Sequence, residues 1–285
     1  MAKIVNFHRM DKNIGDLVSA PTLYFDFPGM EVKRTEISDI DKQNISDENV
    51  IVGGGGLLSD YFFPYIKAAR EKTKKGKLVA WGIGQQVDEG SWWKDYKTFP
   101  YKRYLEGFDL VGVRDFNLGE PWVPCASCMH SAFDNPTAPE HEFVVFSHLS
   151  RQVPIQGWPT YGNDNSDFED TIKFLSSGET VITSSYHGMY WALLLGRNVL
   201  VFPFNSKFFS FKYPVTLYPS IWKQPAGWKA ALKTLLGKRS SGGYECKSVD
   251  GWRLLAGASR GFPDALSECR EKNVEFYNKV LGLIG

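Results

Sequence analysis

The residues best suited to chemistry lie in the stretch Thr183–Gly188, which contains two serines, a tyrosine and a histidine. The apolar pair Val181–Ile182 before it predicts the end of a buried strand. Residues 188–195 predict a helix that is apolar nearly all round and therefore buried. In open α/β sheets ligands bind at such a strand-to-helix turn, and a helix N-terminus favours an anion. His187 can supply a proton or a positive charge there. Alternatively, His187 only caps the turn through a hydrogen bond to the backbone.

Glycines and an arginine follow two further expected strands. Residues 49–52 predict a buried strand that runs into four glycines, whose backbone a ligand could approach closely: Gly53, Gly54, Gly55 and Gly56. This run lacks the spacing of the known phosphate-binding and dinucleotide-binding glycine motifs, so it does not identify a ligand. Arg114 follows the strand expected at residues 108–113 and suits bidentate binding of a carboxylate or phosphate. The alternative is a surface ion pair between Arg114 and Asp115.

Two more polar segments follow expected strands. Asn13 and Asp16 come after the first strand, residues 3–7, and are typical of a turn that opens a helix. They either contact a ligand or serve only to form the turn. Lys207 lies in an aromatic and basic loop after the strand expected at residues 198–202. We expect Lys207 to face the ligand site, unless it is an ordinary surface lysine.

The elements that position these residues repeat as strand, glycine and helix at spacings of about 30 residues, which predicts parallel βαβ units and an α/β fold. Prolines between residues 121 and 139 punctuate the chain and place a domain boundary near residue 137. The sequence therefore predicts two domains, residues 1–137 and 138–285. Within the second domain, Ser166 and Glu169 predict a capping box at the start of a helix.

Two further helices are expected toward the C-terminus. Residues 227–239 form a short basic amphipathic pattern, which either packs by its apolar face or rests on an anionic membrane surface. Residues 263–281 predict a long amphipathic helix that clasps one domain. Its expected buried positions are Leu266, Cys269, Val274, Tyr277 and Leu281.

Composition excludes several classes of protein. A net charge of +1 gives no global field for nucleic acid, so we expect no nucleic-acid partner. No apolar run is long enough to span a membrane, and the N-terminus is typical of a strand rather than a signal peptide. Four cysteines make no disulfide framework, which indicates a reducing cytoplasm. Cys125, Cys128 and His130 have no second ligand pair, so we expect a core or loop role for them and no metal.

Six short motifs occur in one order between residues 10 and 210, and together they resemble the polysaccharide pyruvyltransferase family. They are Asn13–Asp16, Gly53–Gly56 after its strand, Trp81–Gly84, Val113–Asp115, Tyr186–Gly188 and Asn205–Lys207. The resemblance implies two Rossmann-like domains that face each other across a cleft, as in the GT-B glycosyltransferase architecture. It also implies transfer of the enolpyruvyl part of phosphoenolpyruvate to a saccharide, which gives a pyruvate ketal.

The resemblance further implies cytoplasmic work on cell-surface polysaccharide intermediates, often lipid-linked, with phosphoenolpyruvate as donor and no cofactor. His187 is our candidate general acid or phosphate-stabilising cation, and Asp16 our candidate base. We assign donor binding to Arg114 and Lys207 and to smaller residues of the two turns: Ser184, Ser185, Gly188, Gly53, Gly54, Gly55 and Gly56. We assign acceptor binding to Asn13 and Tyr186.

One residue departs from the family pattern. Well-described members have an arginine two residues before the motif histidine, and this chain has Ser185 there. Loss of that cation removes a strong charge-assisted contact to an anion. Two alternatives therefore stay open: a GT-B-type glycosyltransferase that uses a nucleotide sugar, and a catalytically inactive sugar-binding homologue.

Overall fold

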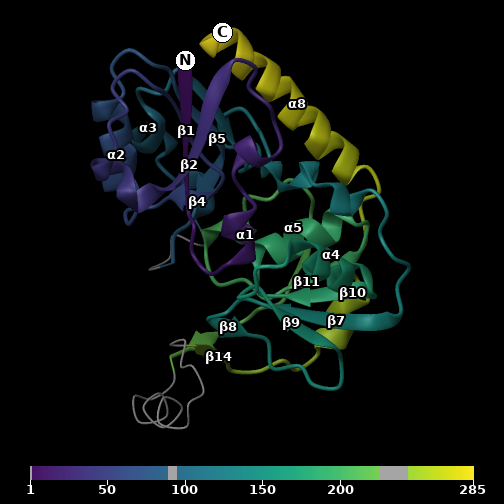
Figure 1. Cartoon of the computed structure of the whole chain (residues 1–285). Helices are drawn as coiled ribbons and strands as arrows, with labels where there is room; N and C mark the ends of the chain where they lie inside the picture. The colour runs from purple at the N-terminus through teal and green to yellow at the C-terminus, as the bar shows by residue number, and fades with distance from the viewer. Residues whose placement is uncertain (1, 89–94, 225–242) are drawn as a thin grey trace. The chain divides into compact units, whose positions relative to one another are not determined.

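The chain folds as an α/β protein with parallel sheets, seen in a computed structural model that describes residues 2–88, 95–224 and 243–285 (Figure 1). It forms two compact units. Unit 1 contains residues 1–130, 205–212 and 266–285, and unit 2 contains residues 131–204 and 213–265. These units differ from the continuous domains 1–137 and 138–285 that the sequence predicts. The reason is that two later segments, residues 205–212 and 266–285, pack with the N-terminal unit.

Unit 1 is built on one six-stranded parallel sheet. Its strands are β1 (Ala2–His8), β2 (Met30–Glu36), β3 (Asn49–Val52), β4 (Gly55–Leu58), β5 (Leu78–Gln85) and β6 (Leu110–Val113). The order is β2-β1-β3-β5-β4, and β6 also pairs with β5. β3 pairs with the first residues of β5 and β4 with its last. The sequence prediction missed β2, a half-polar edge strand, and β4, which begins inside the glycine run.

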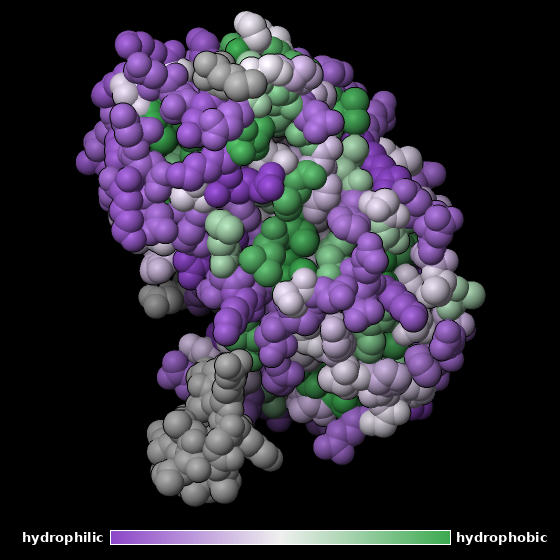
Figure 2. Space-filling model, in the orientation of Figure 1, coloured by the Kyte–Doolittle hydropathy of each residue, from purple (hydrophilic) through white to green (hydrophobic). Residues whose placement is uncertain are grey.

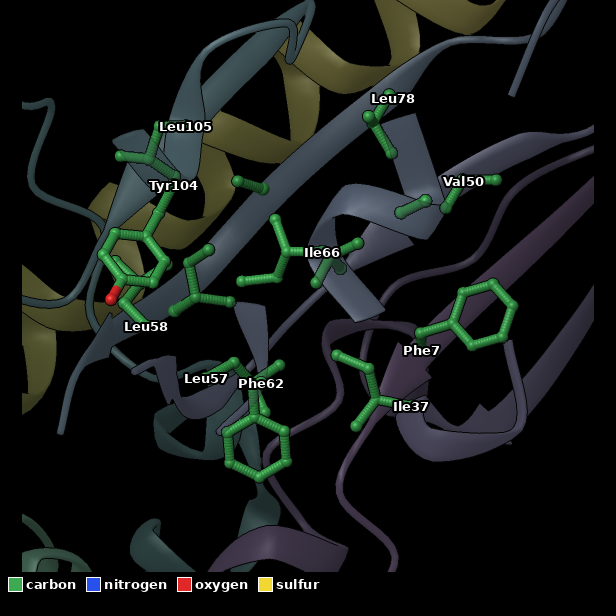
Figure 3. Packing of buried hydrophobic residues seen from close by; sticks show 14 of the residues in the cluster. Phe7, Ile37, Val50, Leu57, Leu58, Phe62, Ile66, Leu78, Tyr104 and Leu105 are labelled. Carbon is green, nitrogen blue, oxygen red and sulfur yellow. The ribbon is translucent and has the colours of Figure 1, made fainter. Parts of the chain in front are cut away.

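Side chains of this sheet alternate between two buried faces, as the pleat requires. Val5, Phe7 and Val50 belong to the core cluster that includes residues of α2 (Phe63–Lys72) and α3 (Tyr101–Leu105). Figure 3 shows this packing, with Ile66 of α2 and Tyr104 of α3 among the labelled side chains. The outer face of α2 is hydrophilic in Figure 2, so the helix buries only one stripe.

The opposite face of the unit 1 sheet packs against the C-terminal helix α8 (Ala265–Ile284). The Trp81 indole N–H donates to Asn273 Oδ1 on α8 at 3.0 Å. The buried stripe of α8 is Ala265, Cys269, Asn273, Phe276 and Val280. The expected stripe was therefore right at Cys269 and wrong at Val274, which is 41% exposed. Hydropathy could not place Asn273 inside, because its partner Trp81 is far away in the sequence.

Unit 2 has a five-stranded parallel sheet of order β12-β11-β10-β7-β9. These strands are β7 (His141–Ser147), β9 (Thr160–Gly162), β10 (Gly178–Thr183), β11 (Asn198–Val201) and β12 (Thr216–Leu217). Helices α4 (Phe168–Ser176) and α5 (Tyr186–Leu194) contact β10, and α7 (Trp252–Ala256) contributes to the core cluster that contains Phe143 and Leu200. The expected capping box of α4 is wrong: Asp167 is the N-cap, and its side chain accepts from the Asp170 N–H.

The remaining elements are short. A three-stranded sheet in unit 2 joins β8 (Arg151–Gln152), β13 (Trp222–Lys223) and β14 (Tyr244–Cys246). Besides α1 (Ile14–Leu17), there are short 3₁₀-helices at Pro21–Leu23, Ile37–Lys42, Tyr96–Thr98, Ala126–Met129, Ser131–Phe133 and Ser206–Phe208. Among the described residues, no helix is both long and apolar enough to cross a membrane. The basic helix expected at residues 227–239 lies outside the described residues.

Candidate functional site

The carboxyl edge of the unit 1 sheet gathers several of the residues singled out from the sequence. Because its strands run parallel, the segments that follow β1, β3 and β6 begin at one edge. Helix α1 follows β1 and carries Asp16, and Arg114 directly follows β6. Asn13 is the N-cap of α1, and its Oδ1 accepts from the Gly15 N–H at 3.1 Å. Asn13, which the sequence analysis assigned to binding of the acceptor saccharide, therefore also caps α1.

Arg114 is a buried cation whose side chain packs against Gly84 and Gly56. Only 3% of its surface is exposed, so it is not part of the surface ion pair that the sequence left open. A Cβ built on Gly84 would lie 2.7 Å from Arg114 Nε, and one on Gly56 would lie 3.1 Å from an Arg114 terminal nitrogen. Side chains at these two positions would displace the guanidinium. The glycines thus provide the space in which Arg114 lies at the sheet edge.

The glycine run packs against protein backbone at its start. The Gly53 N–H donates to the Phe7 carbonyl at 3.0 Å and the Gly54 N–H to the Ser19 carbonyl at 3.2 Å. A Cβ on Gly53 would lie only 1.9 Å from the Trp81 carbonyl oxygen. These two N–H groups are therefore already bonded, contrary to the expectation that the whole run exposes its donors. Gly55, by contrast, lies beside the carboxyl of Asp16: its Cβ would be 3.7 Å from Asp16 Oδ1.

Lys207 belongs to unit 1, although the strand before it belongs to unit 2. Ser206 Oγ accepts from the Val87 N–H at 3.0 Å, and the Ser206 N–H donates to the Val87 carbonyl at 3.2 Å. Asn205 Nδ2 donates to Asp88 Oδ1 at 2.7 Å. Lys207 is therefore not the ordinary surface lysine that the sequence left open. The chain passes over to unit 1 for residues 205–212 and buries Lys207 there, with 7% of its surface exposed.

The carboxyl of Asp16 interacts electrostatically with both Lys207 and Arg114. It keeps some exposed surface but is densely surrounded by protein, and this burial raises the pKa of its carboxyl to about 6. Lys207 and Arg114 are the two strongest opposing influences and favour the charged form. Arg114 also favours the charged form of the Asp115 carboxyl, so this edge of the sheet combines two buried cations with two carboxyls.

His8, at the end of β1, was missed by sequence reasoning. It is buried, its Nδ1 lies 3.2 Å from the Asp16 carbonyl oxygen, and burial lowers the pKa of its ring. An imidazole nitrogen that faces a carbonyl must carry the proton, so neutral His8 presents an unprotonated Nε2. The only signal in the sequence is its position at a strand's carboxyl end.

Asp115 was considered only as a surface partner of Arg114 and is in fact buried. Its Oδ2 accepts from the Gln85 backbone N–H and the Tyr101 hydroxyl, both at 2.8 Å. Its Oδ1 accepts from Ser210 Oγ at 2.5 Å. Burial raises the pKa of Asp115, and Arg114 and the three donors oppose that rise.

In unit 2 the stretch after β10 is arranged around the start of α5. Ser185 is the N-cap, and its Oγ accepts from the Gly188 N–H at 3.3 Å. Ser184 Oγ donates to the Arg151 carbonyl at 2.5 Å and accepts from the His148 N–H at 2.9 Å. A Cβ on Gly188 would lie 2.4 Å from the Phe146 ring. All three residues assigned to donor binding here also hold the turn together.

His187 lies in the first turn of α5 and is nearly buried, with 6% of its surface exposed. Its ring stacks on Trp191 at 5.1 Å between centroids and meets Tyr186 edge to face at 5.5 Å. The buried, all-round apolar helix predicted from the sequence is confirmed, since every residue of α5 is buried and Gly196 follows it in a left-handed conformation.

Two further residues near the carboxyl end of β7 escaped the sequence analysis. The His148 ring packs on Phe204 at 5.1 Å between centroids. The Arg151 guanidinium lies over the Tyr244 ring at 3.2 Å and over the Phe204 ring at 4.9 Å. Arg151 is thus a cation of unit 2 stacked on aromatic rings, and its contacts depend on β14, which the sequence did not predict.

The candidate residues therefore fall into two groups. Unit 1 holds one group with Asp16, Arg114, Lys207, Gly55 and Gly56. Unit 2 holds the other group with Ser184, Ser185, Tyr186, His187 and Gly188. Within the described ranges, no three His, Cys, Asp or Glu side chains are placed to hold a metal ion. Cys125 and Cys128 are buried in unit 1, where burial raises the pKa of the Cys125 thiol.

No protein-family model matches the sequence, and comparison with curated proteins finds no match. Among solved structures, the chain is similar to a functionally uncharacterised protein from Klebsiella pneumoniae. The two chains are 16% identical, the similarity covers 71% of this chain and 83% of the other, and the TM-score is 0.44. A similarity of this size carries no argument about function.

Proposed function

We propose that the protein transfers the enolpyruvyl group of phosphoenolpyruvate to two hydroxyls of a saccharide and forms a pyruvate ketal. The observation that carries this proposal is the pair of buried cations, Arg114 and Lys207, beside Asp16 at the carboxyl edge of unit 1. Phosphoenolpyruvate carries a carboxylate and a phosphate, and two cations match this pair of anionic groups. The ordered motifs that resemble the polysaccharide pyruvyltransferases support the same reaction.

The proposed chemistry needs one acid and one base. His187 protonates the methylene carbon of the donor, and a saccharide hydroxyl attacks the adjacent carbon while Asp16 takes its proton. The C–O bond to phosphate then breaks, a second hydroxyl attacks the same carbon and closes the ketal, and the departing phosphate takes the proton of that hydroxyl. A carboxyl with a pKa of about 6 is mostly ionised at neutral pH, so Asp16 can accept that proton. Arg114 and Lys207 bind the donor and stabilise the departing phosphate.

The proposed function also requires a particular arrangement of domains. It takes the two units as Rossmann-like domains of a GT-B-like enzyme, with both groups of residues acting on one substrate. Arg114 and Lys207 then supply the positive charge that Ser185 does not. The acceptor is a saccharide intermediate, lipid-linked in the cytoplasm, and no cofactor takes part.

The test is stabilisation by the donor, because a ligand that binds only the native state raises stability by RT ln(1 + [L]/Kd). Phosphoenolpyruvate at millimolar concentration should raise Tm, whereas UDP, GDP and CMP should not. Arg114→Ala should weaken donor binding by roughly tenfold to a hundredfold, as expected for loss of a charge-assisted contact. Lys102→Ala, which removes an exposed lysine of α3, is the control and should keep the full shift.

Two outcomes would contradict the proposal. A Tm shift with one nucleotide and none with phosphoenolpyruvate would favour the nucleotide-sugar glycosyltransferase. A shift with a saccharide alone, and with no donor of either kind, would favour the inactive sugar-binding homologue.

A further inference from the structure

Asp115 joins four parts of unit 1 through its two carboxylate oxygens. Oδ2 bonds to the sheet and to α3, because it accepts from the Gln85 N–H of β5 and from the Tyr101 hydroxyl of α3. Oδ1 bonds to the segment 205–212, because it accepts from Ser210 Oγ. Asp115 itself directly follows Arg114 at the end of β6. One buried carboxylate therefore bonds both to the frame of the unit and to the segment that the chain brings over from unit 2.

The bond to Ser210 fixes the backbone just after Lys207. Ser210 Oγ lies 3.3 Å from the Lys207 carbonyl oxygen, and the Ser210 carbonyl accepts from the Phe116 N–H at 2.8 Å. On the other side of Lys207, Ser206 exchanges two hydrogen bonds with Val87. Lys207 is thus held between two anchored serines. Of these two anchors, only the later one ends on a carboxylate, that of Asp115.

Lysine carries a flexible four-carbon stem, so an ordered position for its ammonium has to be imposed by the surrounding structure. Here the ammonium acts on the Asp16 carboxyl more strongly than Arg114 does. We propose that Asp115 is a positioning residue, which through Ser210 holds Lys207 beside Asp16 and so completes the donor-binding group proposed above. The role in donor binding rests on the function proposed above, whereas the positioning of Lys207 does not.

The two oxygens of Asp115 provide a matched pair of variants. Ser210→Ala removes the bond on Oδ1, which is the link between Asp115 and the segment after Lys207, whereas Tyr101→Phe removes a bond on Oδ2 and leaves that link in place. Both substitutions delete one hydroxyl from a buried network. A role of Asp115 in stability alone predicts the same result for both, and a positioning role predicts different results.

The first measurement needs no ligand: a carboxyl ¹³C NMR titration of Asp16. Ser210→Ala should raise the Asp16 pKa above its value of about 6, because Lys207 would be held less firmly beside the carboxyl and an opposite charge nearby lowers a carboxyl pKa. Tyr101→Phe should leave it unchanged. Lys207→Met should raise it as well, and Ser210→Ala should add nothing further in the Lys207→Met background. An unchanged Asp16 pKa in folded Ser210→Ala, or equal effects of Ser210→Ala and Tyr101→Phe, would overturn the proposal.

The second measurement uses phosphoenolpyruvate binding by calorimetry. Ser210→Ala should weaken it about tenfold and Tyr101→Phe much less. If the wild-type protein binds no phosphoenolpyruvate, the proposed function fails, and the titration of Asp16 still decides the role of Asp115. If Ser210→Ala does not fold, Ser210→Cys keeps the volume with a weak donor and replaces it in both measurements.

Discussion

The carboxyl edges of the two parallel sheets differ in the kind of polar group that they carry. In unit 1 the edge holds charges: Arg114, Lys207 and Asp16. In unit 2 the turn after β10 holds hydroxyls and a ring, with Ser185 and His187 at the start of α5. Parallel sheets therefore provide the same position for a site, and the residues after each strand decide its chemistry. In the function proposed above, the unit 1 residues bind the anionic donor and the unit 2 residues transfer a proton.

The two edges also compensate their polar groups differently. In unit 1 buried charges are balanced by other charges and by side-chain hydroxyls, as at Asp115. In unit 2 the serine hydroxyls bond to backbone groups, which is capping rather than charge pairing. Substitutions in unit 1 should therefore change pH dependence and anion affinity. Substitutions in unit 2 should change turnover or local helix stability.

The largest effect is expected at His187, the proposed proton donor. His187→Gln keeps a polar side chain of similar length but cannot act as an acid, so phosphate release from phosphoenolpyruvate with a saccharide acceptor should fall by about 10² to 10⁴. Loss of the stacking on Trp191 should also lower Tm modestly. His141→Gln, at the amino end of β7, is the control. Near-normal turnover in folded His187→Gln would show that another residue is the acid. The assignment of proton transfer to unit 2 would then be wrong.

The next effect concerns the pH dependence of stability at Asp16. Its pKa of about 6 lies above the ordinary value of 3.8, so between these values the folded state binds more protons than the unfolded state. The stabilising contribution of the protonated form is full below pH 4 and is lost as pH rises through 6. Asn cannot ionise, so the free energy of unfolding of Asp16→Asn should not fall in this way as pH rises. Above pH 7 it should exceed that of wild type by up to about 3 kcal/mol.

Urea unfolding at pH 4.5 and pH 7.5 measures this effect, with Asp26→Asn, an exposed aspartate of unit 1, as the control. Equal stability of Asp16→Asn and wild type at pH 7.5 would show that Asp16 is not desolvated. The charged character of the unit 1 edge would then rest on the cations alone.

The smallest effect is expected at Ser185. Ser185→Ala removes the N-cap of α5, and the free energy of unfolding should fall by about 1 kcal/mol. Ser185→Thr keeps the hydroxyl and should retain most of the stability. Chemical denaturation of both variants makes the comparison. If Ser185→Ala were as stable as wild type, the hydroxyl would not act as a cap, and the description of the unit 2 turn would need revision.

Strand β3 and the buried helix α5 could be predicted because their apolar runs are local and a glycine marks the end of each. The edge strand β2 could not, because one of its faces is solvated and its pattern is mixed. The role of Gly53 depends on the carbonyl of Trp81, and the place of Lys207 depends on a crossing of the chain. Such partners are distant in the sequence, so residue spacing holds no signal for them. The predicted halves place Asp16, Arg114 and His187 with the units in which they lie, whereas Lys207 lies in the other unit.

The two late segments of unit 1 also determine the order in which the protein can be completed on the ribosome. Residues 1–130 of unit 1 are made before unit 2, whereas α8 is made after it. Until α8 emerges, Trp81 and the apolar residues around it lack their cover. Exposed apolar surface on a nascent chain promotes aggregation and chaperone binding. Unit 1 therefore cannot complete its core until α8 has been made, after the whole of unit 2.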